Sequence, residues 1–458
     1  MWLRESDTGA TCGSAGTTRG GGPTVEVGVE VIDDTGIDDT TQAAPAAAPT
    51  GLRILVHDFA GHPFQVDLSR ALARRGHTVR HVYCQGYTSG KGALDDGGLD
   101  NLSVVGLSTG RSFARYSPVR RVRQEVGYGA RFSREAASFK PDVILACNVP
   151  LIAKVVSASW CEMRRIPWVF WLQDLHSLAM SREAEKRAGV AGRTMGTAFE
   201  RIERALLRRA DAVVSITDDF GPTLDRWGVG DGRHTVIENW APLDDFPQQP
   251  RDNGWRRRQG LGDRFLFLYT GTLGLKHRPE VLYSLAEQHE GDADVVVISE
   301  GMGEARLREM LAERPLANLR LLPFQPIEDY PEILGAADAL VALLEPAAGT
   351  FSVPSKVLSY LCAGRPILAA IPPHNLAART IQRAGAGVVV PPDDNEAFLV
   401  AAKEMRVDAD QRAKAGANGR RYAESVFDTM AITDRFEGVI SAALGHRGST
   451  TTPSTKGN

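Results

Sequence analysis

The chain has 458 residues, of which 43% are hydrophobic and 24% are charged, and its formal net charge at pH 7 is −3. These values are typical of a globular protein with two or three domains, and the near-neutral charge argues against nucleic acid as a partner. The five cysteines are scattered without a Cys-x-x-Cys spacing, so the sequence carries no zinc or redox motif of that kind.

The two ends of the chain differ from the rest in composition. Residues 1–50 are rich in Gly, Thr, Ala and Asp, and residues 446–458 are polar. Such segments cannot bury enough apolar surface to order themselves, so we expect a disordered N-terminal extension and a disordered tail. We find no signal-peptide pattern and no apolar run long enough to span a bilayer. This predicts a cytoplasmic protein whose membrane contact, where it exists, is peripheral and at the inner face.

The first ordered half begins with a strand at 53–57, a helix at 65–75 and a second strand at 78–83. Buried apolar strands alternate with helices from there to residue 237. Strands without polar alternation, separated by helices, favour a parallel sheet that is covered on both faces. We therefore expect an N-terminal α/β domain at 51–245.

A polar stretch with three prolines at 242–258 interrupts this pattern, and we interpret it as a linker. Strand–helix alternation restarts at Phe265 and continues to Val390, which predicts a C-terminal domain at 246–429. An amphipathic helix at about 430–444 follows. The predicted fold class is α/β, with two doubly wound, Rossmann-like domains that face a cleft. Ligands are expected at the carboxyl ends of the strands.

The segment 352–368 reads as an anion-binding helix start followed by a buried strand. Ser352, Pro354 and Ser355 suit the first turn of a helix, and Lys356 adds a positive charge. Backbone N–H groups at such a helix start would hold a phosphate or diphosphate. The alternative is an ordinary capped helix in an α/β core.

Three further loops follow predicted strands of the second domain. They contain Gly271, Thr272 and Lys276; then Gly301 and Gly303; then Phe324 and Gln325. Glycines let the backbone approach a ligand closely, and a lysine supplies charge for a diphosphate. Loops at one edge of one sheet, together with the helix start at 352–356, predict a nucleotide site. Each loop taken alone is equally an ordinary strand–helix turn. The chain lacks a Gly-x-Gly-x-x-Gly fingerprint and a Walker sequence, which disfavours NAD enzymes and phosphate-loop ATPases.

The order of these motifs resembles a retaining B-fold glycosyltransferase of family four, the glycosyl transferases group 1, especially its polysaccharide-synthesis members. Segments of the first domain at 57–65, 72–79, 210–217 and 236–240 are similar to signatures of the same family. The resemblance covers roughly residues 52–444. It implies transfer of a sugar from a nucleoside diphosphate sugar to a hydroxyl of a carbohydrate or lipid-linked acceptor, in polysaccharide or glycolipid synthesis. It also implies that the final helix crosses back onto the first domain.

The resemblance also implies roles for particular residues. In the donor site we expect Gly271, Thr272, Lys276, Gly301, Gly303, Phe324, Gln325, Ser352, Pro354, Ser355 and Lys356. On the acceptor side we expect Gly61, His62, Phe64 and Gln65. Asp174, His176 and Lys276 are the candidate catalytic residues, although Asp174 could instead cap a helix. No metal and no cofactor are expected, because the lysines and helix-start amides would stabilise the diphosphate.

One departure from the family concerns its usual Glu-x7-Glu pair, whose positions are taken here by Phe351 and Ser359. The chain resembles a subgroup that carries Val-Pro-Ser-Lys at this place and lacks the pair. Two alternatives to a transferase remain at this stage: a B-fold nucleotide-sugar epimerase and a catalytically silent nucleotide-binding subunit.

The segment Arg111–Arg134 contains seven arginines and one acidic residue, with apolar residues interleaved. This pattern suits an anionic membrane surface or a lipid-diphosphate acceptor. The alternative is a solvated basic helix.

Overall fold

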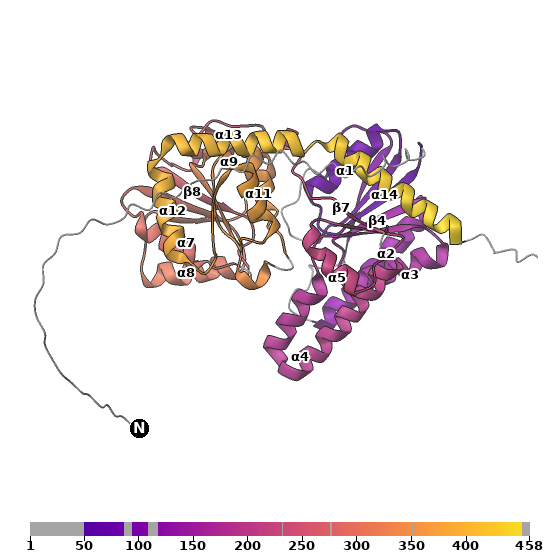
Figure 1. Ribbon diagram of the computed structural model, residues 1–458. Helices are drawn as coiled ribbons and strands as arrows, with labels where there is room; N and C mark the ends of the chain where they lie inside the picture. The colour runs from indigo at the N-terminus through magenta and orange to yellow at the C-terminus, as the bar shows by residue number, and fades with distance from the viewer. Residues whose placement is uncertain are drawn as a thin grey trace, which may run out of the picture. The chain divides into compact units, whose positions relative to one another are not determined.

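The structure is a computed structural model that describes residues 50–86, 94–108, 118–230, 232–274, 277–349 and 352–450 (Figure 1). The predicted N-terminal extension, Lys276, Phe351 and the first arginines of the basic segment lie outside these ranges. Among the helices in the described ranges, none combines the length and apolar character needed to cross a membrane.

The first half of the chain forms a seven-stranded parallel sheet in the order β3-β2-β1-β4-β5-β6-β7. Every residue of β4 and β5, the strands after β1 in this order, is buried, which is why both read as continuous apolar runs. The strands are β1 (Arg53–Asp58), β2 (Thr78–Cys84), β3 (Leu102–Leu107), β4 (Val143–Cys147), β5 (Trp168–Leu172), β6 (Ala212–Ser215) and β7 (His234–Val236).

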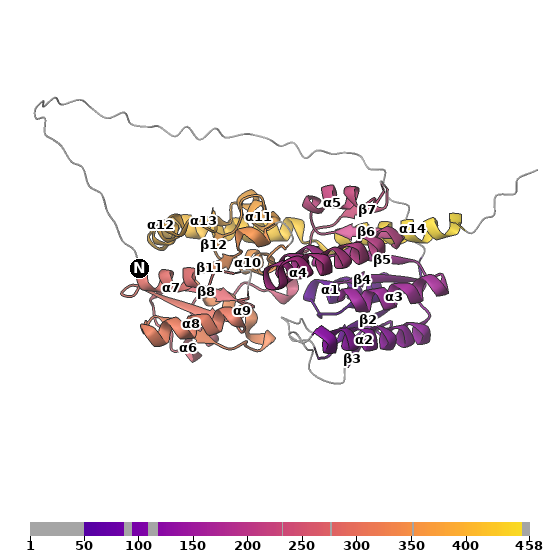
Figure 2. The same ribbon diagram turned by 90° about the horizontal axis from the view of Figure 1, so that it is seen from below.

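Helices connect these strands and cover the sheet (Figures 1 and 2). They are α1 (Pro63–Arg74), α2 (Pro118–Phe139), α3 (Leu151–Arg164), α4 (His176–Arg209) and α5 (Gly221–Arg226), with a short 3₁₀ turn at Asp218–Phe220.

Helix α4 is a hairpin of two helical arms. The chain reverses at Gly189, whose φ of 52° and ψ of −123° are not helical. A Cβ at Gly192 would lie 1.9 Å from the carbonyl oxygen of Ala184, so only glycine permits this close approach of the arms.

The second half forms a six-stranded parallel sheet in the order β10-β9-β8-β11-β12-β13. Its strands are β8 (Phe265–Thr270), β9 (Ala293–Ile298), β10 (Leu319–Leu322), β11 (Ala339–Leu343), β12 (Ile367–Ala370) and β13 (Gly387–Val390). Its helices are α6 (Gly254–Arg258), α7 (Glu280–Gln288), α8 (Met302–Glu313), α9 (Tyr330–Ala336), α10 (Lys356–Ala363), α11 (Leu376–Ala384), α12 (Asn395–Val407) and α13 (Ala409–Val426), with 3₁₀ turns at Leu243–Asp245, Ile327–Asp329 and Pro346–Ala348. Both sheets are parallel and doubly wound, which confirms the predicted fold class.

The polar stretch at 242–258 is only partly a linker. Trp255 is fully buried, and Arg256 is 2% exposed. The Arg256 guanidinium donates to the carbonyl oxygens of Ala336 at 2.6 Å and of Gly262 at 2.7 Å. An arginine that donates to backbone acceptors in this way can be buried at little cost. The polar composition of 242–258 therefore did not indicate an exposed linker at Arg256.

The last helix, α14 (Thr429–Thr450), packs on the first sheet. Phe436 is fully buried, and its ring centroid lies 4.5 Å from that of Trp171 in β5. Arg75, at the end of α1, pairs with Asp434 and Glu437 of α14. Near the other end of α14, Arg447 Nε donates to Asp211 Oδ1 at 2.8 Å. Residues 446–450, which the sequence placed in a disordered tail, are therefore helical, because this ion pair extends the helix.

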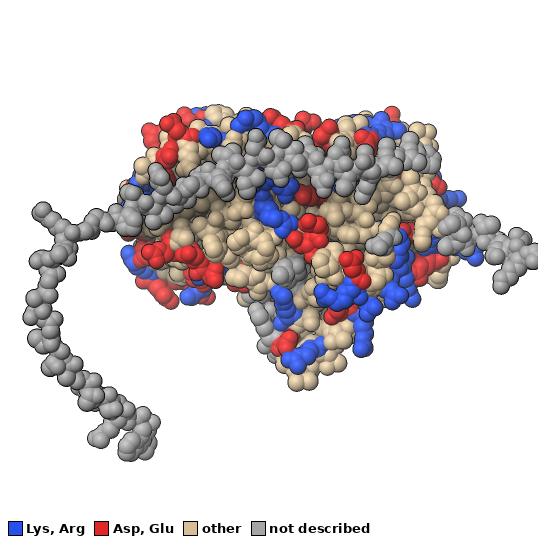
Figure 3. Space-filling model, viewed as in Figure 1, with Lys and Arg blue, Asp and Glu red and all other residues tan. Residues whose placement is uncertain are grey.

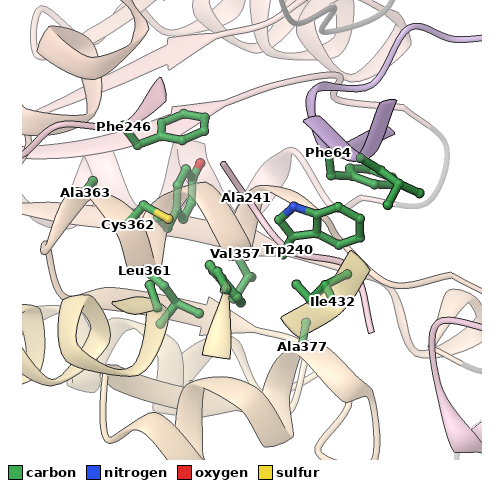
Figure 4. Close-up of a cluster of buried hydrophobic side chains, with 14 of the residues drawn as sticks. Phe64, Trp240, Ala241, Phe246, Val357, Leu361, Cys362, Ala363, Ala377 and Ile432 are labelled. Atoms are coloured by element: carbon green, nitrogen blue, oxygen red, sulfur yellow. The ribbon is translucent and has the colours of Figure 1, made fainter. Parts of the chain in front are cut away.

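One buried apolar cluster includes side chains from α1, α10, α11, α14 and the segment between the two sheets. Figure 4 shows part of it, with Phe64, Trp240, Phe246, Val357 and Ile432 among the residues drawn. Residues 240–246 are thus a packed connection and not a free linker.

Candidate functional site

Lys356 and the loop after β8 meet at the carboxyl end of the second sheet. Lys356 is the first residue of α10, and its Cε and Nζ lie 3.5 Å from the point where a Cβ on Gly271 would be. Its Nζ also lies 3.4 Å from the centroid of the Tyr269 ring, a cation–π contact. Tyr269 Oη donates to the carbonyl oxygen of Thr272 at 3.1 Å. The buried Tyr269 therefore orients both the lysine and the glycine loop.

The second glycine loop is fastened to the first. Gly301 has a φ of 121°, which favours glycine. Gly303 N–H donates to Leu273 O at 2.8 Å, and Leu273 N–H donates to Ser299 Oγ at 2.9 Å. A Cβ on Gly303 would lie 2.6 Å from Leu273 Cγ, so this contact has no room for a larger residue. The structure therefore brings together the first two predicted loops and Lys356.

The start of α10 differs in detail from the sequence expectation of hydroxyl caps. Ser355 is the N-cap residue, but its side chain makes no capping hydrogen bond and is exposed. Ser352 is buried, and its carbonyl oxygen accepts from Asn375 Nδ2 at 2.9 Å. Pro354 is also buried. Ser355 and Lys356 are therefore the two predicted residues here that face outward at least in part.

The third predicted loop supports the site less directly. Phe324 is partly buried against the core, and Gln325 Nε2 donates to Pro323 O within its own loop at 2.8 Å. This loop follows β10, the edge strand, two places from β8 in the sheet. The order of the strands along the chain does not show this separation from Lys356.

A pocket joins this region to the first sheet. It is lined by Ile216, Glu238 and Asn239 from the first half, and by residues of the α10 and α11 region that include Pro354 and Ser355. Burial raises the pKa of the Glu238 carboxyl, while Arg383 opposes this effect. Sequence reasoning named this segment only as a family signature and missed Glu238 as a pocket residue. A second pocket, lined by Gly387, Glu404 and Lys414, lies near the start of β13 and away from these loops.

At the edge of the first sheet, the loop after β1 wraps the buried Asp58 carboxylate. Asp58 accepts the N–H groups of Ala60 at 3.0 Å and of His62 at 2.7 Å, and Gly61 between them has a φ of 80°. Burial acts to raise the pKa of Asp58, but the imidazoles of His62 and His81, whose ring nitrogens lie 3.6 and 3.7 Å from the carboxylate, outweigh it and hold that pKa below its usual range.

Of the four predicted acceptor-side residues, His62 is the one with a partly exposed side chain, at 25%. Phe64 is 5% exposed and packs between Trp171 and Trp240, with ring centroids 5.7 and 5.6 Å away. Gln65 is fully buried, with its amide against Asp58 and Cys147. The predicted contact of Phe64 and Gln65 with an acceptor stays a prediction. The apolar face of α1 turns Phe64 into the core, where it supports the loop, and Gly61 is buried as well.

The predicted catalytic pair lies where α4 begins. Asp174 does not cap this helix; instead, Ser177 N–H donates to Glu203 Oε2 at 3.0 Å. His176 Nδ1 lies 4.0 Å from Glu203 Oε1. The side-chain amides of Gln173 and Asn239 bond to each other at 2.6 Å, which ties this loop to the pocket described above.

Sequence reasoning missed Glu203 and its neighbour Lys154. Glu203 is fully buried in an arginine-rich helix arm, where a glutamate looks like a solvated residue. Lys154, in the first turn of α3, is 2% exposed, and its Nζ lies 3.5 Å from the Phe170 ring centroid. Burial lowers the pKa of Lys154 to about 8, while the charge of Glu203 opposes this shift. The apolar neighbours of Glu203 along the helix, Leu206 and Leu207, were the signal that it faces inward.

Within the described ranges, no group of three or more His, Cys, Asp or Glu side chains is arranged to hold a metal ion. Lys276 lies outside these ranges, so its predicted roles stay predictions.

Two parallel, doubly wound sheets with glycine loops at a carboxyl edge have the architecture of the B fold. Two family models match the chain in tandem. The glycosyl transferase 4-like domain matches residues 61–240, and the glycosyl transferases group 1 family matches residues 252–422. The chain therefore carries two glycosyltransferase domains in tandem, of which the second matches the group 1 family, and this confirms the resemblance seen in the sequence.

Known proteins agree with this assignment. WcaI of Escherichia coli strain K12, a proposed colanic acid biosynthesis glycosyl transferase, is 24% identical over 306 residues, which are 65% of this chain and 73% of WcaI. Sucrose-phosphate synthase from Thermosynechococcus elongatus has a TM-score of 0.65 at 18% identity and covers 84% of this chain and 97% of its own. HepE of Anabaena, in complex with UDP and glucose, has a TM-score of 0.64 at 16% identity and covers 85% of this chain and all of its own. At these identities the two structures show likeness of fold.

Proposed function

We propose that this glycosyltransferase moves a sugar from a nucleoside diphosphate sugar to a hydroxyl of a carbohydrate or lipid-linked acceptor, with retention at the anomeric carbon. The observation that carries the proposal is the convergence of Lys356, Gly271 and the Gly301–Gly303 loop at one edge of the second sheet. A diphosphate needs a cation and close backbone approach, and these residues supply both.

The diphosphate is the leaving group, so the charge that develops on it has to be stabilised. In the proposed site this is done by Lys356 and by Lys276, which lies two positions after Gly274 in the sequence, without a metal ion. The UDP bound to HepE, a neighbour in fold, supports a nucleoside diphosphate as ligand. Activity that survives excess EDTA would support the metal-free site, and loss of activity that Mg²⁺ or Mn²⁺ restores would contradict it.

The proposed biological setting is polysaccharide or glycolipid synthesis, which the name of WcaI supports. A lipid-linked acceptor would sit at a membrane, and α2 offers a face for that contact. Arg120, Arg123, Arg131 and Arg134 are exposed on it, with Val122 and Val126 exposed at 46% and 43%. Lys and Arg side chains also gather on the part of the visible face that carries α3, α4 and α5 (Figure 3). Such a mixture favours anionic lipid headgroups.

The function is tested in two stages. A thermal-shift screen of nucleoside diphosphates identifies the base, because a bound ligand raises the apparent melting temperature. Turnover of the corresponding donor sugars is then measured with and without oligosaccharide or lipid-linked acceptors, and the anomeric configuration of the product is read by NMR. Product with the donor's configuration supports the proposal. Nucleotide binding without acceptor-dependent turnover, or an inverted product, would contradict it.

A further inference from the structure

Two imidazoles lie near the carboxyl edge of the first sheet, and each has a buried carboxylate behind it. His62 lies in the loop after β1 beside Asp58, and His176 begins α4 beside Glu203. Asp58 is saturated by backbone N–H groups and by the Gln65 amide. The Glu203 carboxylate, in contrast, has one buried oxygen that accepts no hydrogen bond within the described residues.

The two oxygens of the Glu203 carboxylate differ in their hydrogen bonding. Oε2 accepts the Ser177 N–H at 3.0 Å and so fixes the start of α4. Oε1 is buried and makes no hydrogen bond within the described residues. Leaving a buried charged oxygen without a donor is costly, so a nearby donor is strongly favoured. The ring nitrogen Nδ1 of His176 lies 4.0 Å away, and a hydrogen bond between the two atoms requires that distance to shorten to about 3 Å.

Lys154 explains why a carboxylate can be held at this depth. Its buried ammonium group is the cation whose charge acts on Glu203, and it comes from α3, a different element. A cation placed behind the carboxylate offsets part of the cost of burying its negative charge. The pair thus supplies a fixed acceptor for one nitrogen of the imidazole.

We propose that Glu203 is a positioning residue, which holds His176 with its proton on Nδ1 and leaves Nε2 as a hydrogen-bond acceptor for a sugar hydroxyl. The inference rests on the proposed function, because the hydroxyl would belong to the donor sugar or to the acceptor. The His176 side chain is 33% exposed, so its outer nitrogen can be reached. The Gln173–Asn239 bond places the same loop beside the pocket that contains Ser355. A carboxylate behind one ring nitrogen commonly fixes the tautomer of an imidazole in this way.

The direct test is the tautomer of His176, read from ¹⁵N shifts of histidine-labelled protein at a pH where the ring is neutral, with His176→Ala to assign the signal. Wild type should show the Nδ1–H form. In Glu203→Gln, the amide oxygen can still accept from Ser177, and the amide NH₂ then faces Nδ1. The Nε2–H form should therefore replace the Nδ1–H form. An Nε2–H tautomer in wild type, or the same tautomer in both proteins, would overturn the proposal.

The matched control is Glu200→Gln, one turn earlier in the same helix arm, where the carboxylate accepts from Trp227 Nε1 at 3.2 Å. Glu203→Gln should lower kcat at least tenfold with a similar melting temperature, whereas Glu200→Gln should leave kcat within twofold. In a His176→Ala background, Glu203→Gln should have no further effect on kcat. Equal losses from both glutamine variants would reduce Glu203 to a structural role and overturn the proposal.

Donor Kd and acceptor KM show which substrate carries the hydroxyl. His176→Ala should raise the donor Kd if the hydroxyl belongs to the donor, or raise the acceptor KM alone if it belongs to the acceptor, and a change in neither would contradict the proposal. If wild type turns over no nucleotide sugar, the proposed function fails, but the tautomer of His176 still decides whether Glu203 positions it. If Glu203→Gln does not fold, the wild-type tautomer alone decides.

Discussion

Phe436 of the last helix packs against Trp171 of a strand in the first sheet, with ring centroids 4.5 Å apart, although 265 positions separate them in the chain. Trp240 lies beside the same contact, and Arg75 of the first half pairs with Asp434 and Glu437 in the same part of α14. The last helix of the chain, α14, therefore packs on the first sheet. It follows directly on α13, which packs on α10 of the second half. A connection of this kind limits how the two halves can move.

This contact predicts a large loss of stability on Phe436→Asp, because an unpaired charge would replace a fully buried ring. The free energy of unfolding should fall by about 3–5 kcal/mol or more, as for removal of a buried aromatic ring. Chemical denaturation followed by tryptophan fluorescence measures it. The control is Met430→Asp on the same helix, where the side chain is 48% exposed. Similar losses of unfolding free energy in the two variants would contradict a specific contribution of the Phe436 contact to stability.

The fastening of the two glycine loops predicts that Gly303→Ala weakens donor binding. The added methyl would lie 2.6 Å from Leu273 Cγ and 2.8 Å from Leu273 O, so the loop at 271–274 has to shift. We expect the free energy of donor binding to become less favourable by about 1–3 kcal/mol, the range for overpacking. Gly445→Ala is the matched control, since it lies in α14 with open space around it. Unchanged donor affinity in Gly303→Ala would mean that the loop does not touch the donor.

Lys154 predicts a particular dependence of stability on pH. Its pKa is lowered from 10.5 to about 8 by burial, so the unfolded chain binds more protons between these values. Stability should therefore rise with pH through this window, by about 2 kcal/mol between pH 7 and pH 9.5. Below pH 8 the cost of burying the charged form is fully present.

The comparison variant is Lys154→Met, which lacks this titration but keeps all other groups. The difference in unfolding free energy between wild type and variant should move in favour of wild type by about 2 kcal/mol over the same pH range. Urea denaturation at several pH values gives this difference. A constant difference would show that Lys154 is not held in the interior with a lowered pKa.

The sequence predicted the parts of the fold that depend on local pattern. Continuous apolar runs such as 143–147 and 168–172 indicated buried parallel strands, and the strand–helix order gave the class of fold. The hairpin of α4 was missed, because its reversal depends on Gly189 and on the close approach at Gly192. A pattern of apolar spacing carries no information about such a contact between two arms.

The donor-side loops were predicted better than the first-sheet site. Gly271, Gly303 and Lys356 follow strands or begin a helix, and their position at a sheet edge follows from topology alone. Glu203 and Lys154 come from the interior of helix pairs, and only tertiary packing brings them beside His176. A charged residue inside a helix reads as solvated unless its buried partner is known.

The measurement that most directly tests the account is calorimetric binding of nucleoside diphosphates to wild type, Lys356→Ala and Lys276→Ala. Loss of one charge-assisted contact should cost about 1.5–3 kcal/mol, so Kd for the preferred nucleotide should rise about 10- to 150-fold in each variant. Lys403→Ala, an exposed lysine of α12, is the control and should bind like wild type. We predict that one nucleoside diphosphate binds wild type well and both site variants poorly. Affinity that is equal in all four proteins, or the absence of binding by any nucleoside diphosphate, would contradict it.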